Sequence, residues 1–281
     1  MAASKTAEYV ALYRALETTE HRRAPLFHDP FARRFLSRGL VVALRASQLP
    51  AVRPLLERYA DARAPGARTS AIARTAFLDD VVRDAIRGGA RQLVLLGAGF
   101  DCRGHRLAEL ANTVVFEVDR ADTQARKRAL VPATGRDVRY VAVDFERDEL
   151  GAALVSAGWN AAERSVILWE GVTNYLTEGA VRSVLTWIGR TCAAGSTLAF
   201  TYIHAGVLRG DFDGGDRIRG NVARLGEPWT FGIDPAELAA FVGSCGLALR
   251  DDIGADDYRK RYLGAISPGY GFYRIAVTEV R

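Results

Sequence analysis

Apolar runs alternate with segments of helical spacing from residue 92 onward. Runs rich in β-branched and aromatic residues, each bounded by turn residues, predict strands at 92–97, 113–119, 138–145, 165–170 and 196–203. Helical patterns lie between these runs, as expected where a helix connects each strand to the next. The sequence therefore predicts an α/β protein with a doubly wound, Rossmann-like parallel sheet.

Two further apolar runs, at 247–252 and 271–279, bring the expected sheet to seven strands. The loop after the first of them is too short for a crossover helix, so we predict an antiparallel terminal hairpin. An insertion rich in Gly and Asp, at about 204–232, precedes this hairpin. Asp234-Pro235, just beyond the insertion, is typical of a helix start.

The N-terminal part of the chain contains no strand pattern. Tyr9, Val10, Leu12, Tyr13 and Leu16 recur at helical spacing, and five prolines break the region into several helices. We therefore expect a helical N-terminal cap at 1–84 and a core at 85–281 that contains the sheet.

The composition is that of an ordinary globular protein. The 281 residues are 49% hydrophobic and 25% charged, which favours one α/β domain with an added cap over two independent domains. The net charge of +5 comes from arginines scattered along the chain rather than from one basic run, so we expect no nucleic-acid partner. The pattern does not indicate an oligomeric state.

Cysteine usage and hydropathy indicate a compartment. Cys102, Cys192 and Cys245 are too far apart to form a metal-ligand pair, so no metal site is expected. An odd number of cysteines without a signal peptide favours reduced thiols and a cytoplasmic location. No apolar run is long enough to cross a bilayer, and we expect no membrane partner.

A glycine turn after the first strand is the strongest candidate for a ligand site. Gly97-Ala98-Gly99 follows a buried strand, and Asp119 ends the next strand about 20 residues later, where a βαβ unit places an acid against ribose hydroxyls. A dinucleotide fingerprint needs a third glycine at position 102, which is Cys102. S-adenosylmethionine needs the close backbone approach and the acid without a phosphate cradle, so this cofactor is favoured over a nicotinamide dinucleotide.

Several polar residues follow the predicted strands at their carboxyl ends, where such sheets bind ligands. Besides the glycine turn and Asp119, these are Asp144, Glu170 and His204. Each acid taken singly could instead cap the helix that follows it.

Motifs along almost the entire chain resemble those of the leucine carboxyl methyltransferase-like family of S-adenosylmethionine-dependent methyltransferases, including its bacterial natural-product O-methyltransferases. They are Lys5–Ala7, Arg14–Glu17, Phe27–Ala32, Arg74–Asp80, Leu96–Arg103, Phe116–Arg120, Asp144–Phe145, Glu170–Leu176 and Gly226–Gly232. Cys102 stands where a threonine is common, and Phe145 stands where a leucine is usual.

The resemblance implies roles for residues of the cofactor site. Arg74 would bind the methionine carboxylate, Glu170 would face its ammonium group, and Gly97, Ala98 and Gly99 would line the methionine part. Asp119 would hold the ribose hydroxyls, while Asp144 and Phe145 would frame the adenine. A surface ion pair with Asp79 or Asp80 is the alternative for Arg74.

The acceptor side has its own candidate residues. Tyr175 and His204 could act as a general base for a phenol, whereas a carboxylate acceptor needs none. The acceptor pocket is expected between the sheet rim and the cap, closed by the segment from His204 to Trp229. Tyr9, Tyr13 and Arg14 of the cap, and Trp229 at the end of that segment, could contact the acceptor. Each could instead serve only packing or loop structure.

The sequence thus predicts an O-methyltransferase that modifies a carboxylate or phenolic hydroxyl of a small molecule, of polyketide-type or aromatic natural-product character. A nicotinamide-dependent oxidoreductase and a non-catalytic cofactor- or RNA-binding protein are the alternatives.

Overall fold

A seven-stranded sheet runs through the computed structural model, which describes residues 5–264 and 269–281. The strand order is β3-β2-β1-β4-β5-β7-β6, and all neighbours pair in parallel except β7, which is antiparallel to both β5 and β6. The strands are β1 (Gln92–Leu96), β2 (Val114–Asp119), β3 (Val138–Ala142), β4 (Ser165–Trp169), β5 (Thr197–Ile203), β6 (Leu247–Gly254) and β7 (Tyr273–Val280). The predicted fold class is confirmed.

The order of the strands reverses at β1, which lies between β2 and β4. All residues of β1 and β4 are buried, because both faces of these central parallel strands are covered. The crevice beyond the carboxyl ends of strands at such a reversal is where open α/β sheets bind ligands. The predicted glycine turn lies at this point.

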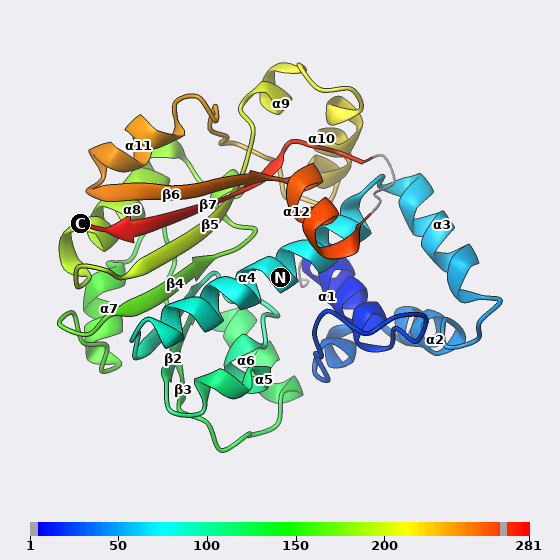
Figure 1. Ribbon diagram of the computed structural model, residues 1–281, viewed down its shortest axis with the longest axis horizontal. Coiled ribbons are helices and arrows are strands. Elements are labelled where there is room, and N and C mark those ends of the chain that lie inside the picture. Colours follow the sequence, from blue (N-terminus) through cyan, green and yellow to red (C-terminus); the bar gives the residue numbers. More distant parts are fainter. Residues whose placement is uncertain (1–4, 265–268) are drawn as a thin grey trace.

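Helices cover both faces of the sheet (Figure 1). They are α1 (Lys5–Thr18), α2 (Arg38–Ala46), α3 (Arg53–Arg63), α4 (Ala67–Arg87), α5 (Arg103–Arg106), α6 (Ala121–Leu130), α7 (Leu150–Ser156), α8 (Glu178–Thr191), α9 (Gly206–Arg209), α10 (Gly215–Arg224), α11 (Leu238–Ser244) and α12 (Ala255–Leu263).

The apolar pattern of the helices explains which face each one covers. In α8, Thr177 caps the first turn by accepting a hydrogen bond from the backbone N–H of Ala180 at 3.2 Å, and residues 181, 184, 185 and 188 form one buried stripe. This stripe joins the core shared with α7 and α11. Phe77, Leu78 and Val82 of α4 pack on the opposite face together with α12.

The connection between the last two strands differs from the prediction. The strands do pair antiparallel, but α12 lies between them instead of a short loop. The polar run of residues 256, 257 and 259–261 hid this helix in the sequence. Its buried side consists of Ala255, Tyr258 and Arg259, and the hydroxyl of Tyr258 lies 2.6 Å from that of Ser70 on α4. Asp234-Pro235 likewise forms a turn, and α11 begins only at Leu238.

The N-terminal helices lie together at the end of the molecule away from the amino ends of all strands except β7, which runs the other way (Figure 1). Helix α4 runs from this group onto the sheet, so it spans the expected boundary at residue 84. Among the described residues, no helix is long and apolar enough to cross a membrane.

A buried carboxylate joins α4 to the segment after β1. Asp79 is fully buried and accepts a hydrogen bond from Nε of Arg103 at 2.8 Å. Arg106 donates two more, each at 2.7 Å, in a bidentate arrangement. Both arginines are almost completely buried, so loss of this carboxylate would leave Arg106 without its bidentate partner and Arg103 with one buried partner fewer.

We predict that Asp79→Ala destabilises the protein by about 3–5 kcal/mol, because it removes a buried carboxylate that accepts three hydrogen bonds and leaves the guanidinium of Arg106 without its bidentate partner. The measurement is the free energy of unfolding in urea. Asp84→Ala is the matched control: its carboxylate pairs with Arg87 on the same helix but is 68% exposed, so the loss should stay below about 1 kcal/mol. Equal losses in the two variants would contradict the role given to Asp79.

Candidate active site

The glycine turn after β1 has a backbone that other residues rarely adopt. Gly97 and Gly99 have φ angles of +64° and +41°, and the N–H of Ala98 donates to the carbonyl of Val118 at 2.9 Å. A Cβ atom on Gly97 would lie 2.3 Å from Cγ2 of Val172. The turn is therefore shaped both by its own backbone and by the loop that follows β4.

Asp119 at the end of β2 is tied to this turn. Its Oδ2 accepts a hydrogen bond from the N–H of Gly99 at 2.6 Å, and its Oδ1 accepts one from the N–H of Arg120 at 2.7 Å. Burial raises the pKa of this carboxyl group above its ordinary value. Each carboxylate oxygen can accept a further bond, so the carboxylate can also receive a hydroxyl pair of a ribose.

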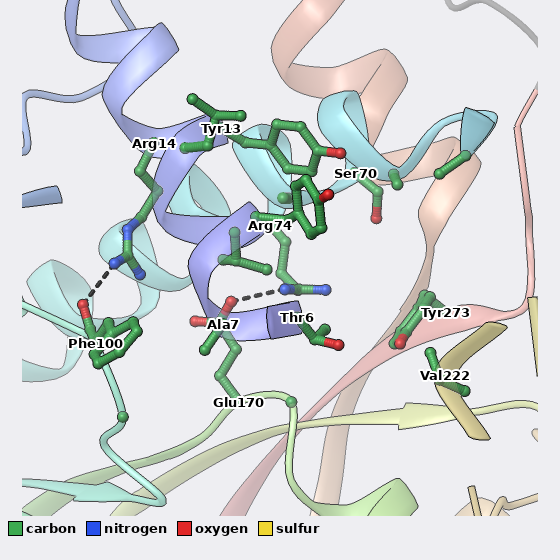
Figure 2. A pocket seen from close by; sticks show the side chains of 18 of the residues that line it. Thr6, Ala7, Tyr13, Arg14, Ser70, Arg74, Phe100, Glu170, Val222 and Tyr273 are labelled. Carbon is green, nitrogen blue, oxygen red and sulfur yellow. Dashed lines mark hydrogen bonds and ion pairs between the residues drawn. The ribbon is translucent and has the colours of Figure 1, made fainter. Parts of the chain in front are cut away.

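Glu170 after β4 is held by two arginines. Nε of Arg74 lies 2.7 Å from Oε1 of Glu170 (Figure 2), and Nη1 of Arg103 lies 2.9 Å from Oε2. Burial alone would raise the pKa of Glu170, but the charges of Arg103 and Arg74 outweigh it and lower the pKa. The carboxylate therefore stays ionised, and Arg74 pairs with Glu170 rather than with Asp79 or Asp80.

Arg103 connects the site to the rest of the structure and was not among the site residues expected from the sequence. It binds Asp101, Asp79 and Glu170 at once. Burial would raise the pKa of Asp101, but the charge of Arg103, with Arg14 and Lys127, lowers it to about 2. The position of Arg103 at the start of the helix after the glycine turn was the available signal.

A second buried ion pair lies next to the segment that follows the glycine turn. Nζ of Lys127 on α6 lies 2.7 Å from Oε2 of Glu117 on β2 and also donates to the carbonyl of Asp101. Both side chains are about 1% exposed. Sequence reasoning missed this pair, because ten residues and a change of element separate its members.

A cavity of about 600 Å³ extends from the glycine turn to the N-terminal helices. Its walls come from the turn, the loop after β4, the helices α1, α2, α3, α4 and α10, and the aromatic residues Trp229, Tyr270 and Tyr273. Figure 2 shows part of this lining, including Tyr13, Arg74 and Glu170. Ten of the residues predicted from the sequence line it: Tyr9, Tyr13, Arg14, Arg74, Gly97, Ala98, Gly99, Glu170, Tyr175 and Trp229.

Four predicted residues do not line this cavity. Asp119 is hydrogen-bonded to the backbone of the turn at Gly99. Asp144 accepts a hydrogen bond from the N–H of Glu146 at 3.1 Å, and the ring of Phe145 lies 6.0 Å from that of Trp169. Asp119 is the last residue of β2, and Asp144 and Phe145 follow β3, the neighbour of β2 in the sheet. His204 takes part in the structure of its own loop: its Nδ1 accepts a hydrogen bond from the N–H of Gly206 at 2.9 Å.

The residues predicted to contact the acceptor differ in their hydrogen bonds, their pKa values and their exposure. Nη2 of Arg14 donates to the carbonyl of Phe100 at 2.5 Å, and its Nε lies 3.1 Å from Oδ2 of Asp29, so Arg14 attaches α1 to the glycine turn. Burial raises the pKa of Tyr13 to about 12 and also raises that of Tyr175. Tyr9 is 48% exposed at the mouth of the cavity.

Comparisons with known proteins point to one family. The family model described as leucine carboxyl methyltransferase matches residues 7–189. A protein of Frankia alni, provisionally named an S-adenosyl-L-methionine-dependent methyltransferase, is 37% identical over 222 residues, covering 78% of this chain and 72% of that protein. A similarly named protein of Streptomyces coelicolor is 37% identical over 209 residues, covering 72% and 70%.

A solved structure has the same overall arrangement. It is a provisionally named methyltransferase from Thermobifida fusca, with a TM-score of 0.63, 18% sequence identity, and coverage of 97% of this chain and 94% of that chain. At this identity the likeness establishes the fold alone.

We predict that Gly97→Ala weakens binding of S-adenosylmethionine at least tenfold, because the added Cβ meets Val172 and displaces the turn. Calorimetric titration measures the affinity. Gly135→Ala is the matched control: its φ is +72°, and nothing lies within 4 Å of its Cβ position. Both variants should lose about 1–2 kcal/mol of stability from the left-handed backbone, but only the first should lose affinity.

We also predict that the affinity for S-adenosylmethionine falls as the solution is acidified. The fall should begin at a pH above the usual pKa of an aspartate, near 3.9. The ionised Asp119 accepts hydrogen bonds from hydroxyls, and its raised pKa means that protonation, and hence loss of binding, begins at a higher pH. Titrations from neutral to acidic pH should show the fall in the wild type and a flat, weaker profile in Asp119→Asn. A profile in the variant that parallels the wild type would refute this role.

Proposed function

This chain belongs to the leucine carboxyl methyltransferase family and is an S-adenosylmethionine-dependent methyltransferase, and from that premise we propose that it methylates an oxygen of a small molecule. The acceptor oxygen belongs to a carboxylate or a phenolic hydroxyl, on a molecule of polyketide-type or aromatic natural-product character. One observation carries the choice between these oxygens: the ionisable groups that line the cavity.

The residues of the turn fit the cofactor. Gly97 leaves room where a side chain would collide with Val172, Gly99 supplies a second left-handed backbone position, and Asp119 presents a carboxylate for the ribose. Arg74 and Glu170, paired across the cavity wall, offer a cation and an anion to the amino-acid end of the cofactor. When bound, the cofactor supplies a methyl group on a positively charged sulfur.

The cavity favours an acceptor that is already ionised. Among the described residues that line it there is no histidine and no lysine. Glu170 and Asp101 are kept ionised by arginines that occupy their oxygens, and burial raises the pKa values of Tyr175 and Tyr273. None of these groups removes a proton from a phenol of pKa near 10 at neutral pH, whereas a carboxylic acid needs no base. We therefore favour the carboxylate.

The chain's own contribution is then to bind, orient and exclude water. The outer walls of the cavity are mainly aliphatic and aromatic, including Leu12, Leu56 and Trp229, and they suit an apolar acceptor skeleton. Holding an acceptor oxygen in line with the methyl group can supply up to about 7–11 kcal/mol of the barrier reduction. Tyr175, protonated at neutral pH, can donate a hydrogen bond that fixes the orientation of that oxygen.

We place this reaction in the cytoplasm. Cys102, Cys192 and Cys245 are buried and free, which supports a reducing compartment. We also propose that the region 1–84 acts as the cap over the acceptor, since α1, α2 and α3 supply much of the outer wall.

The test uses pairs of aromatic compounds with one skeleton, one carrying a carboxylate and the other a phenol. With isotopically labelled cofactor, we expect the acids to gain a labelled methyl group that mild base removes, as an ester requires. Aryl ethers survive that treatment. A higher kcat/KM for the phenols would overturn the carboxylate assignment, and no transfer to either series would count against O-methylation of such acceptors.

We predict that Tyr175→Phe lowers kcat/KM for the acceptor about tenfold or more, the cost of one hydrogen bond to a charged oxygen. The dissociation constant of S-adenosylmethionine should change less than twofold. Tyr59→Phe is the matched control, since Tyr59 also lines the cavity but is 59% exposed at its mouth. Equal effects of the two changes would exclude a specific role for Tyr175.

A further inference from the structure

The helices α2 and α3 expose an unusual set of large apolar side chains. Val42, Leu49, Leu55 and Tyr59 are 64%, 59%, 61% and 59% exposed. They account for four of the seven large apolar residues that are exposed in the described part of the chain. Figure 1 shows both helices at the end of the molecule away from the sheet. Leu49 lies in the connection between them.

Spacing places these residues among arginines on the outer sides of the helices. On α2 and the turn after it, positions 38, 42, 45 and 49 recur at helical spacing and are all exposed, whereas Leu44 is buried. On α3, positions 55, 58 and 59 are exposed in the same way. We call this set the cap-tip surface; its members are Arg38, Val42, Arg45, Leu49, Leu55, Arg58 and Tyr59.

Positive charge predominates on the cap-tip surface, none of whose seven members is acidic. Residues 31–56 contain five arginines and no carboxylate. Arg53 is buried and pairs with Glu20 and Glu57. The other arginines of this range and Arg58 are exposed, and none forms an ion pair within the described part of the chain. The cap-tip surface therefore presents guanidinium groups whose charges are not compensated.

The acceptor cavity lies directly beneath this surface. Leu40 and Ala43 of α2, and Leu56 and Tyr59 of α3, line its outer wall. Tyr59 belongs to both the wall and the cap-tip surface. An apolar molecule at the tip would thus have a short path, along apolar side chains, toward the glycine turn.

We propose that the cap-tip surface docks onto an anionic lipid bilayer. Guanidinium groups bind lipid phosphates, and the aliphatic side chains beside them enter the boundary between headgroups and acyl chains. No spanning helix is needed, so this proposal departs from the expectation of no membrane partner, which rested on the lack of a long apolar run. It is independent of which oxygen the enzyme methylates.

The same features disfavour two other partners. In a two-fold dimer the patch would meet itself, and its exposed arginines, which form no ion pairs within the described part of the chain, would face one another. A nucleic acid would use the arginines but gain nothing from exposed Val42, Leu49 and Leu55, since it is bound through phosphates and stacked bases. An anionic bilayer uses both components of the surface.

Vesicle flotation with the full-length protein tests the proposal. We expect binding to vesicles of phosphatidylglycerol and phosphatidylcholine in equal parts to be at least tenfold tighter than binding to pure phosphatidylcholine. Binding should weaken as salt is added, because screening reduces the attraction. Equal binding to both vesicle types, or no binding to either at low salt, would overturn the proposal even if every variant failed to fold.

Two double variants separate charge from apolar contact. Arg38→Glu with Arg45→Glu should weaken binding to the anionic vesicles at least tenfold, since each arginine near such a surface contributes a factor of about five. Val42→Asp with Leu49→Asp should weaken it similarly. Arg147→Glu with Val155→Asp is the matched control: both residues are exposed, and Val155 is 58% exposed on α7.

Intact variants are recognised by an unchanged affinity for S-adenosylmethionine. Vesicle binding that is lost in the control as well as in the cap-tip variants would show nonspecific adhesion of a basic protein and overturn the proposal. Light scattering adds a further outcome: a dimer that the cap-tip changes dissociate, without vesicle binding by the wild type, would reassign the surface to a second copy.

Discussion

The ion pairs of Glu170 with two arginines are the interaction on which the site depends. Arg74 reaches it from α4, and Arg103 reaches it from the segment after the glycine turn while also binding Asp79 and Asp101. One buried network thus connects the carboxyl end of β4, the helix that covers the sheet and the turn that receives the cofactor. Because unpaired charges are costly when buried, these elements cannot shift independently.

Much of the fold and part of the site could be predicted from the sequence. Period and turn residues were enough for the seven strands, and the glycine turn with Asp119 lies together as its spacing indicated. Helix α12 was not predicted from the sequence, because its exposed side is densely charged and its buried side is short. The Glu117–Lys127 ion pair and the ion pairs of Arg103 were not predicted, because tertiary packing, rather than local spacing, brings those residues together.

The position of His204 illustrates a limit of arguments from strand ends. It follows β5 as predicted, yet its ring accepts a hydrogen bond in its own loop and packs edge-on to Phe212 at 5.1 Å. The carboxyl ends of a sheet form a long rim, and a cavity occupies only part of it. For this enzyme the cavity lies near β1 and β4, where the cap helices close over the turn.

The placement of β7 has a consequence for how the chain acquires its structure during synthesis. β7 lies between β5 and β6, although it follows both along the chain. Until residues 273–280 leave the ribosome, β5 has an open edge and β6 has no neighbour in the sheet. Open strand edges invite pairing with other chains, so nascent molecules pass through an interval in which aggregation competes with completion of the sheet.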